Sequence, residues 1–208
     1  EQCGSCWAFS VTEEVESVFA IAGNGLKVLS PQQIVSCDGA DAGCGGGDPI
    51  SAYKYIEKAG GLESEAEYPY TSGGGDSGSC HFKHNKITAN ITGFKYATTP
   101  SDKDETQMQS AVANIAPLSI CVDASSWQFY SGGVISSGCG QQLDHCVQAT
   151  GYTMGSADLT DDDSSVKGDY WVVRNSWGGS WGYDGYLYVE IGKNLCGIAD
   201  EATYVTCK

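Results

Sequence analysis

The sequence predicts an α+β fold with two unlike lobes, on the basis of three observations. Apolar residues in the first half of the chain recur at helical spacing. The second half instead contains short alternating or apolar runs that are typical of strands. The chain of 208 residues is long enough to bury a substantial core, in one domain or in two small lobes. A helix-rich segment followed by a strand-rich segment favours two lobes.

The helical half begins just after Cys6. Residues 7–22 place apolar side chains at three- and four-residue spacing, with three glutamates off that stripe. Ser30 and Pro31 supply the cap and first turn of a second, short helix. A third helix is expected at residues 49–59, and residues 104–116 allow one more in the second half.

The strand-rich half starts near residue 86. Residues 87–96 alternate between apolar and polar side chains and are expected to form one strand. Four further runs with strand character follow, at residues 118–122, 146–152, 170–174 and 185–191. Residues 157–167 are acidic and lack apolar periodicity, so we expect a solvated loop between two strands.

Composition excludes several classes of partner. The formal net charge of −15 argues against nucleic acid and against anionic membranes as partners. Ten cysteines indicate disulfides and an oxidising or secretory route, and the sequon at Asn90 is a potential glycosylation site. The sequence contains no apolar run of spanning length and no signal peptide, so we expect no membrane span and a processed or trimmed chain.

Cys6 is the first candidate catalytic residue. It precedes Trp7 at an expected helix start, where the helix dipole and unpaired N–H groups favour a thiolate. Cys3 and Cys6 also form a C-x-x-C pair, which occurs in redox and zinc sites, but no second pair of this kind completes a zinc site. A nucleophilic cysteine requires a histidine and a group that orients it.

His145 is the best candidate for this partner among the three histidines. It lies at the expected start of a strand, whereas His81 and His84 lie in a polar region and are expected to be structural or exposed. Asn175 begins a segment rich in tryptophan and glycine. Its side chain can accept the ring N–H of a histidine, and the indole of Trp177 can shield that bond from water.

Four motifs in order, CGSCWAFS, GCGGG, LDHCV and NSWGGSWGYDGY, resemble those of papain-like cysteine peptidases of the papain and cathepsin L- and F-like family. The separation of 139 residues between Cys6 and His145 agrees with that family. The resemblance covers essentially the whole chain. It implies a helical left lobe, residues 1–98, that carries the nucleophile, and an antiparallel β-barrel-like right lobe, residues 99–208, with the active cleft between them.

The resemblance also implies roles for individual residues. Cys6 is the nucleophile and a backbone oxyanion donor, His145 is its imidazolium partner, and Asn175 orients the imidazole under the shield of Trp177. The family's oxyanion glutamine would fall just before Glu1, so Gln2 is not its equivalent. Two alternatives stay open: the sequence is truncated before Glu1, or the segment that carries this glutamine was lost.

The family pattern pairs six of the ten cysteines. The implied disulfides are Cys3–Cys44, Cys37–Cys80 and Cys139–Cys196. Cys121 and Cys146 depart from the pattern and remain open as two buried thiols or as a cross-strand disulfide. Cys207 is left either as a thiol or as the partner of a segment outside this sequence.

Substrate-binding positions follow from the same resemblance. Gly46 and Gly47 would pair with substrate backbone, because glycine permits close approach. The second subsite would be walled by Leu143, Cys121 and Cys146, with Asp144 beside it, and Glu201 would lie at its bottom. In relatives with glutamate there, basic as well as hydrophobic side chains are accepted.

The expected function is that of a cysteine endopeptidase, because no paired histidines and no long insertion of the exopeptidase type are visible. The alternatives are a catalytically silent homologue that acts as a binding module and, less favoured, a thiol-disulfide oxidoreductase using Cys3 and Cys6. We expect no metal or cofactor. The implied partners are peptide and protein substrates, cystatin-type inhibitors and the chain's own propeptide, for a monomer in the lysosome or vacuole or outside the cell.

Overall fold

The structure, a computed structural model, describes residues 2–155 and 168–207. The chain divides into two compact units: unit 1 is Glu1–Lys95 with Tyr204–Lys208, and unit 2 is Tyr96–Thr203. The sequence-based division falls between residues 98 and 99, near the unit boundary between residues 95 and 96. It assigns residues 204–208 to the right lobe, whereas the structure assigns them to unit 1. The acidic segment predicted as a loop, residues 157–167, lies outside the described residues.

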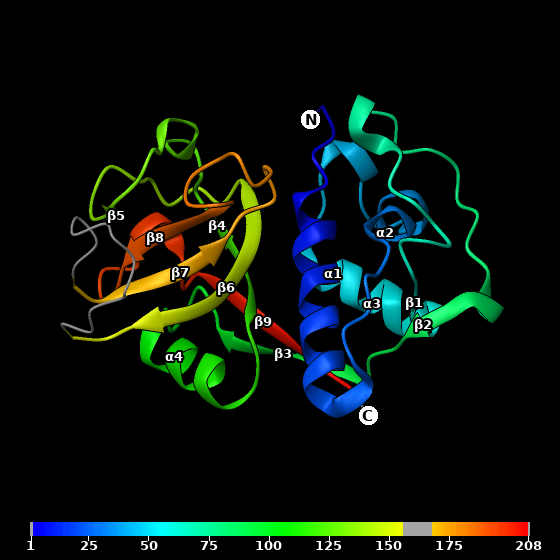
Figure 1. The fold of residues 1–208 in the computed structure, drawn as a ribbon, viewed down its shortest axis with the longest axis horizontal. Helices are drawn as coiled ribbons and strands as arrows, with labels where there is room; N and C mark the ends of the chain where they lie inside the picture. Colours follow the sequence, from blue (N-terminus) through cyan, green and yellow to red (C-terminus); the bar gives the residue numbers. More distant parts are fainter. Residues whose placement is uncertain (1, 156–167, 208) are drawn as a thin grey trace. The chain divides into compact units, whose positions relative to one another are not determined.

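Three helices form the core of unit 1: α1 (Cys6–Phe19), α2 (Pro31–Cys37) and α3 (Pro49–Ala59) (Figure 1). The Ser30 side chain accepts a hydrogen bond from Gln33 N at the start of α2, as its position before a proline predicts. Asp48 caps α3 in the same way. Helix α1 packs against both other helices, and the first part of its apolar face, through Val15, is fully buried, whereas Val18 and Phe19 are partly exposed.

Helix α1 is more deeply buried than its predicted stripe requires. Besides Trp7, Val11 and Val15, the side chain of Glu14 is completely buried. Its Oε1 accepts a hydrogen bond of 3.3 Å from Val205 N, which belongs to the C-terminal part of unit 1. The predicted helix at residues 7–22 also ends early, because Ala20–Asn24 form a π-helical turn in which Gly23 has a φ of 91°.

The predicted single strand at residues 87–96 is wrong, because the structure has two strands there. Strand β2 (Ile87–Ala89) pairs with β1 (Leu62–Glu63) in unit 1, and β3 (Gly93–Thr98) belongs to the large sheet. Gly93 has a φ of 158°, and the chain between the two strands carries the exposed side chain of Asn90. Short 3-10 turns complete unit 1 at Gly43–Gly45, Ser72–Gly74 and His84–Lys86.

One mostly antiparallel sheet has the strand order β3-β9-β4-β6-β7-β8-β5, and most of its residues belong to unit 2. Its further strands are β4 (Leu118–Val122), β5 (Val134–Ile135), β6 (His145–Thr153), β7 (Tyr170–Arg174), β8 (Tyr186–Glu190) and β9 (Glu201–Thr206). The resemblance implied a barrel-like antiparallel sheet, and the observed sheet is consistent with it but is not a closed barrel, because β3 and β5 are its two ends within the described chain. The pair β5–β8 is parallel. Strands β5 and β9 had no predicted counterpart.

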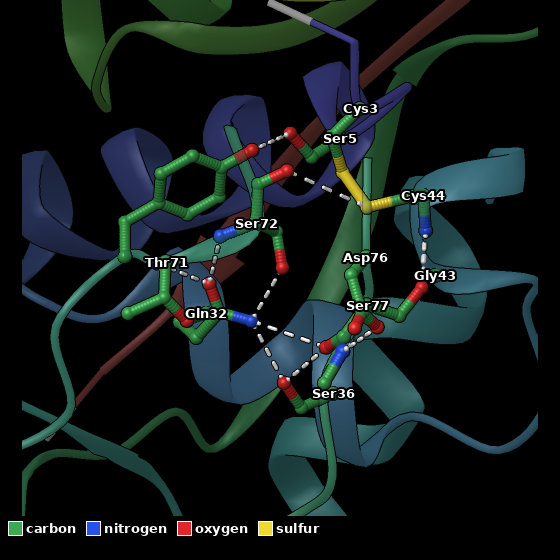
Figure 2. Close-up of a disulfide and its surroundings, with 12 residues drawn as sticks. Cys3, Ser5, Gln32, Ser36, Gly43, Cys44, Thr71, Ser72, Asp76 and Ser77 are labelled. Atoms are coloured by element: carbon green, nitrogen blue, oxygen red, sulfur yellow. Dashed lines mark hydrogen bonds between the residues drawn. A yellow bond between two sulfur atoms is a disulfide. The ribbon is translucent and has the colours of Figure 1, made fainter. Parts of the chain in front are cut away.

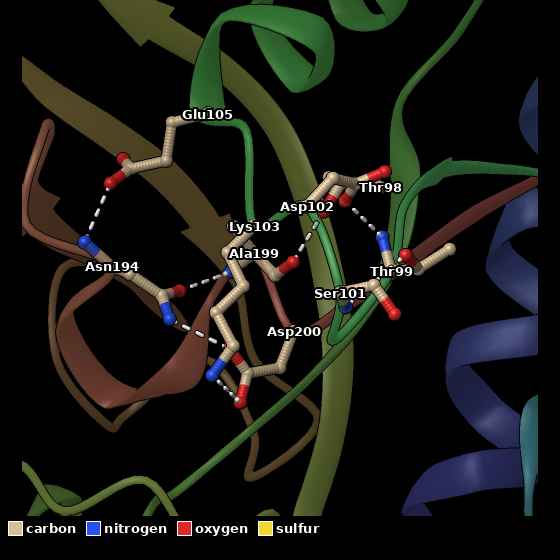
Figure 3. Close-up of polar contacts among 9 residues, drawn as sticks. All are labelled: Thr98, Thr99, Ser101, Asp102, Lys103, Glu105, Asn194, Ala199 and Asp200. Carbon is tan, nitrogen blue, oxygen red and sulfur yellow. Dashed lines mark hydrogen bonds and ion pairs between the residues drawn. The ribbon is translucent and has the colours of Figure 1, made fainter.

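Helix α4 (Glu105–Asn114) packs on this sheet beside β4 and β6 (Figure 1). The buried carboxylate of Glu105 joins its first turn to the sheet and to the loop before β9. It accepts hydrogen bonds from Trp171 Nε1 at 2.8 Å and from Asn194 N at 2.7 Å. Figure 3 shows how Asn194 continues this contact to Asp200, which also pairs with Lys103 at 3.2 Å.

Four disulfides lie within the units, two in each. Unit 1 contains Cys3–Cys44 and Cys37–Cys80. Unit 2 contains Cys139–Cys196 and Cys121–Cys146. The sequence left Cys121 and Cys146 open as two thiols or as a cross-strand disulfide, and the structure has the disulfide. Within the described residues, no helix has the length and apolar character needed to cross a membrane.

Candidate active site

Cys6 is the first residue of α1 in unit 1. It is partly exposed and belongs to none of the disulfides. The first N–H groups of a helix have no partner within the helix, so they favour negative charge at this position. The start of α1 thus has the local geometry expected for a thiolate nucleophile.

The segment before Cys6 is fixed by covalent and backbone contacts. Cys3 is bonded to Cys44 (Figure 2), and Gly4 N donates to Cys44 O at 2.9 Å. A Cβ added at Gly4 would lie 3.0 Å from the same oxygen, so only glycine fits here without a shift. The bridge to Cys44 excludes a redox pair formed by Cys3 and Cys6.

The glycine loop predicted to bind substrate backbone packs against the residue after Cys6. Trp7 is fully buried, and its Nε1 donates to Gly43 O at 3.3 Å. A Cβ on Gly47 would lie 2.5 Å from atoms of the Trp7 ring, which explains the glycine there by close packing. Gly46 has a φ of 113° and open space where a Cβ would be.

Gln32 supports this region, and the sequence did not single it out. Its Oε1 accepts hydrogen bonds from Thr71 N at 2.7 Å and from Ser72 N at 3.0 Å. Its Nε2 donates to Ser72 Oγ at 2.7 Å and to Ser36 Oγ at 2.8 Å (Figure 2). Gln32 therefore ties loop 71–77 to α2 beside the Cys3–Cys44 bridge. The five hydrogen bonds of this buried amide reach partners up to 45 residues away, so no local sequence signal marks it.

In unit 2, His145 is the first residue of β6 and lies 2.7 Å from Asn175, measured from Nε2 to Oδ1. The same oxygen accepts a second hydrogen bond from Ser176 N at 2.8 Å. Reversing the Asn175 amide would set its NH₂ group against the Ser176 N–H, so the oxygen must face both donors. His145 Nε2 therefore carries a hydrogen, and Nδ1 is the ring atom left for other chemistry.

Two indoles enclose the His145 ring. Trp177 stacks on it with ring centroids 5.1 Å apart, and Trp127 meets it edge-on at 6.1 Å. His145 is only 8% exposed, and this burial lowers the pKa of its imidazole, although the Asn175 bond and the Asp144 charge act in the opposite direction. Trp127 is a neighbour that sequence reasoning missed.

The backbone of His145 is positioned by β4. In the antiparallel register, Val122 lies opposite His145 and Cys121 lies opposite Cys146. Asp144 extends this contact, since its N donates to Val122 O at 2.9 Å and its Oδ1 accepts from Ala124 N at 2.8 Å. The Cys121–Cys146 disulfide therefore links the two strands one residue after His145.

Glu201 joins the same row of the sheet. It lies opposite Cys121 in the β4–β9 pair, so Glu201, Cys121 and Cys146 follow one another across three strands. Directly opposed residues share one face of a sheet. Both cysteines are buried, and the Glu201 side chain is partly buried. Leu143 is also partly buried, and it approaches Gly197 so closely that a Cβ there would lie 2.9 Å from its Cδ2.

The predicted site residues thus form two groups. Unit 1 contains Cys6 and the loop with Gly46 and Gly47, and unit 2 contains His145 and Asn175. The remaining predicted positions, which are also in unit 2, are Trp177, Cys121, Leu143, Asp144, Cys146 and Glu201. Gln2 is held through its backbone, since its N donates to Gly73 O at 3.1 Å.

Comparison with known proteins gives consistent results. A family model described as papain family cysteine protease matches residues 1–206. Cysteine proteinase 1 of Dictyostelium discoideum is 41% identical over 96% of this chain, and human cathepsin O is 38% identical over 99% of it. The matches cover 58% and 60% of those two proteins, so the chain spans well under two thirds of either relative.

Solved structures agree with these sequence matches. Bromelain from Ananas comosus, in complex with the inhibitor E64, superposes with a TM-score of 0.84 at 36% identity, covering 99% of this chain and 90% of that one. Digestive procathepsin L 3 of Tenebrio molitor gives a TM-score of 0.85 at 34% identity, covering 98% of this chain and 64% of that one.

Proposed function

The chain belongs to the papain family of cysteine proteases, which confirms the expected α+β fold class, and on this premise we propose that it acts as an endopeptidase with Cys6 and His145 as catalytic residues. The observation that carries the proposal is the His145–Asn175 hydrogen bond of 2.7 Å under the Trp177 ring. A histidine oriented by a buried amide is what a cysteine nucleophile requires of its partner.

In the proposed reaction the Cys6 thiolate attacks the peptide carbonyl carbon and forms a tetrahedral intermediate. The His145 imidazolium then protonates the leaving amine, and water hydrolyses the resulting acyl-enzyme. Burial lowers the pKa of His145 in unit 2, and a thiolate facing the ring would raise it again, because an opposite charge favours the imidazolium. The N–H of Cys6 at the helix start would be one donor to the oxyanion.

For substrate selection, we propose that the Cys121–Cys146 bridge and Leu143 wall the second subsite, with Asp144 at its edge and Glu201 at its base. Gly46 and Gly47 would pair with substrate backbone. The row from Glu201 through Cys121 to Cys146 supports this, since it places a carboxylate beside an apolar disulfide. Such a surface suits a hydrophobic side chain and can also pair with arginine.

The proposed role of Glu201 predicts that its substitution changes the preference for the second substrate residue and does not abolish peptide hydrolysis. In Glu201→Ala, we expect cleavage of a peptide with arginine at the second residue to fall relative to leucine. Glu201→Gln is the matched control, because it keeps the size and removes only the charge, and it should lose arginine preference equally. The ratio of kcat/KM for the two substrates is the measurement, and an unchanged ratio in both variants would contradict the role.

The proposed partners are peptides and proteins as substrates, cystatin-type inhibitors and the propeptide, with the protein acting as a monomer. We place it in the lysosome or vacuole or outside the cell. Four disulfides support a secretory route. The exposed Asn90, followed by Thr92, is accessible for glycosylation.

Labelling with an epoxysuccinyl inhibitor tests the proposed activity. We expect one inhibitor per chain, attached at Cys6, with loss of peptide hydrolysis. Cys207→Ser is the matched control, since Cys207 is the other described cysteine outside the disulfides; it should label normally, whereas Cys6→Ser should not. Absence of labelling in the reduced, intact protein would instead favour a silent homologue that acts as a binding module.

A further inference from the structure

Unit 1 contains a cavity of about 600 Å³ that includes none of the proposed catalytic or substrate-binding residues. Its lining residues come from helix α3, from the end of α2 with the loop after it, and from Cys80 and Phe82. The volume falls in the range of about 300–1,000 Å³ that is usual for small-molecule sites. Its apolar surface comes from Ala59, Phe82 and the Cys37–Cys80 disulfide.

Two lysines line this cavity from one face of α3. Lys54 and Lys58 are four residues apart, so their side chains lie one turn from each other. Neither ammonium group has an ion-pair or hydrogen-bond partner in the part of the chain that the structure describes. This is unusual in a chain with a formal charge of −15, where carboxylates greatly outnumber cations.

A third donor is the hydroxyl of Tyr55, which also lines the cavity. Its oxygen accepts a hydrogen bond from Gln33 Nε2 at 3.1 Å, and its hydrogen has no acceptor among the described residues. Burial raises the pKa of Tyr55 to about 12, so the hydroxyl keeps its hydrogen.

Asp38 is the acidic residue of the lining. Its carboxyl is buried, with 7% of the residue exposed, and its Oδ1 accepts from Ala40 N at 2.9 Å. Burial raises the pKa of this carboxyl, and its Oδ2 is shut off from solvent. The polar groups available to a ligand are therefore mainly donors, two of them cationic.

We propose that this cavity binds an amphipathic anion, with an apolar body against Phe82 and the disulfide and a carboxylate or sulfonate head at Lys54, Lys58 and Tyr55. A cation would meet two ammonium groups, and a neutral apolar ligand would leave their charges unmatched. The assignment is independent of the proposed protease activity, because its residues and its readout involve neither Cys6 nor His145.

Two fluorescent probes of the same apolar shape test the assignment. Anilinonaphthalene sulfonate carries the anionic head, and phenylnaphthylamine is its neutral counterpart. In Lys54→Met/Lys58→Met we expect the affinity for the sulfonate to fall about tenfold, as for two partly exposed ion pairs. The affinity for the neutral probe should stay unchanged. Added salt should weaken binding of the sulfonate alone.

Matched variants separate this site from general surface binding. Lys27→Met/Lys95→Met removes two exposed lysines of unit 1 outside the cavity and should leave both probes unaffected. Phe82→Ala should weaken both probes, because it removes part of the apolar wall. Circular dichroism checks the fold of each variant. Equal sulfonate affinity in the wild type and in Lys54→Met/Lys58→Met overturns the proposal, as does equal loss in the two double-lysine variants.

Discussion

The two units hold their proposed catalytic residues in different ways. In unit 1, Cys6 follows a disulfide, a backbone hydrogen bond at Gly4 and a helix start, so the path of the backbone sets its position. In unit 2, His145 lies at a strand start and its ring is oriented by the side chains of Asn175 and Trp177. The comparison teaches that the contacts of unit 1 fix the backbone before Cys6, whereas those of unit 2 fix the orientation of the His145 ring itself.

The largest expected effect comes from the Cys121–Cys146 disulfide, which gives unit 2 a covalent element of its own. The double variant Cys121→Ala/Cys146→Ala opens a loop of 25 residues. We expect the free energy of unfolding to fall by about 3 kcal/mol, as the loop entropy of such a bridge predicts. We also expect kcat to fall, because β4 and β6 fix the backbone at His145. Denaturant unfolding and steady-state kinetics measure the two effects.

The matched control removes the bridge Cys37–Cys80 of unit 1, which closes a loop of 43 residues. Cys37→Ala/Cys80→Ala should lose at least as much stability, because its loop is longer, yet leave kcat nearly unchanged once the protein is folded. If both variants lowered kcat equally, the disulfide beside His145 would have no positioning role of its own.

A smaller effect is expected from Asn175→Ala, which removes the acceptor of the His145 N–H. Hydrogen bonds to charged groups are worth about 1.5–3 kcal/mol, so kcat/KM should fall on the order of 10- to 100-fold. The Asn175 bond raises the pKa of His145, so its loss lowers that pKa further. The proposed mechanism needs the imidazolium, which is lost as pH rises through this pKa. The alkaline limb of the pH–rate profile should therefore move to lower pH.

Asn175→Asp gives the opposite sign and serves as the control. It keeps an oxygen toward His145 and adds a negative charge, which stabilises the imidazolium. Its alkaline limb should move to higher pH than that of the wild type. An identical shift in both variants would show that Asn175 acts only through the packing of unit 2.

Much of this molecule follows from local sequence patterns. Helix α3 was predicted with its true bounds, because Asp48 and Pro49 mark its start and Gly60 its end. Strands β4 and β7 also begin and end where their apolar runs do. In these segments the capping residues or the apolar run define the element, and tertiary packing leaves its bounds unchanged.

The features that could not be predicted depend on distant partners. Glu14 looks like an exposed helical residue, yet it is buried because Val205 supplies a backbone donor from the other end of the sequence. Strand β9 was missed because its pairing with β4, and not its own pattern, defines it. The family motifs identified the candidate site residues, but Trp127 and Gln32 escaped, since nothing near them in sequence signals their contacts.

The smallest expected effect tests whether the backbone, and not side-chain contacts, sets the position of Cys6. Tyr70→Phe removes the hydrogen bond of 2.7 Å between the Tyr70 hydroxyl and Ser5 Oγ, directly before Cys6, and keeps the ring packed on Phe9. We expect a loss of about 0.5–1.5 kcal/mol in the free energy of unfolding. The rate of Cys6 labelling should change by less than about threefold, because the disulfide and the helix start still set the backbone.

Tyr68→Phe is the matched control for this substitution. It removes a hydroxyl that accepts from His81 N at 3.0 Å and donates to Ser79 O at 3.2 Å, without touching the start of α1. It should cost at least as much stability and leave labelling of Cys6 unchanged. If Tyr70→Phe slowed labelling as strongly as Asn175→Ala slows turnover, Cys6 would depend on side-chain contacts as His145 does. Side-chain contacts would then position the proposed catalytic residue in both units, and the units would differ only in whether that residue is a cysteine or a histidine.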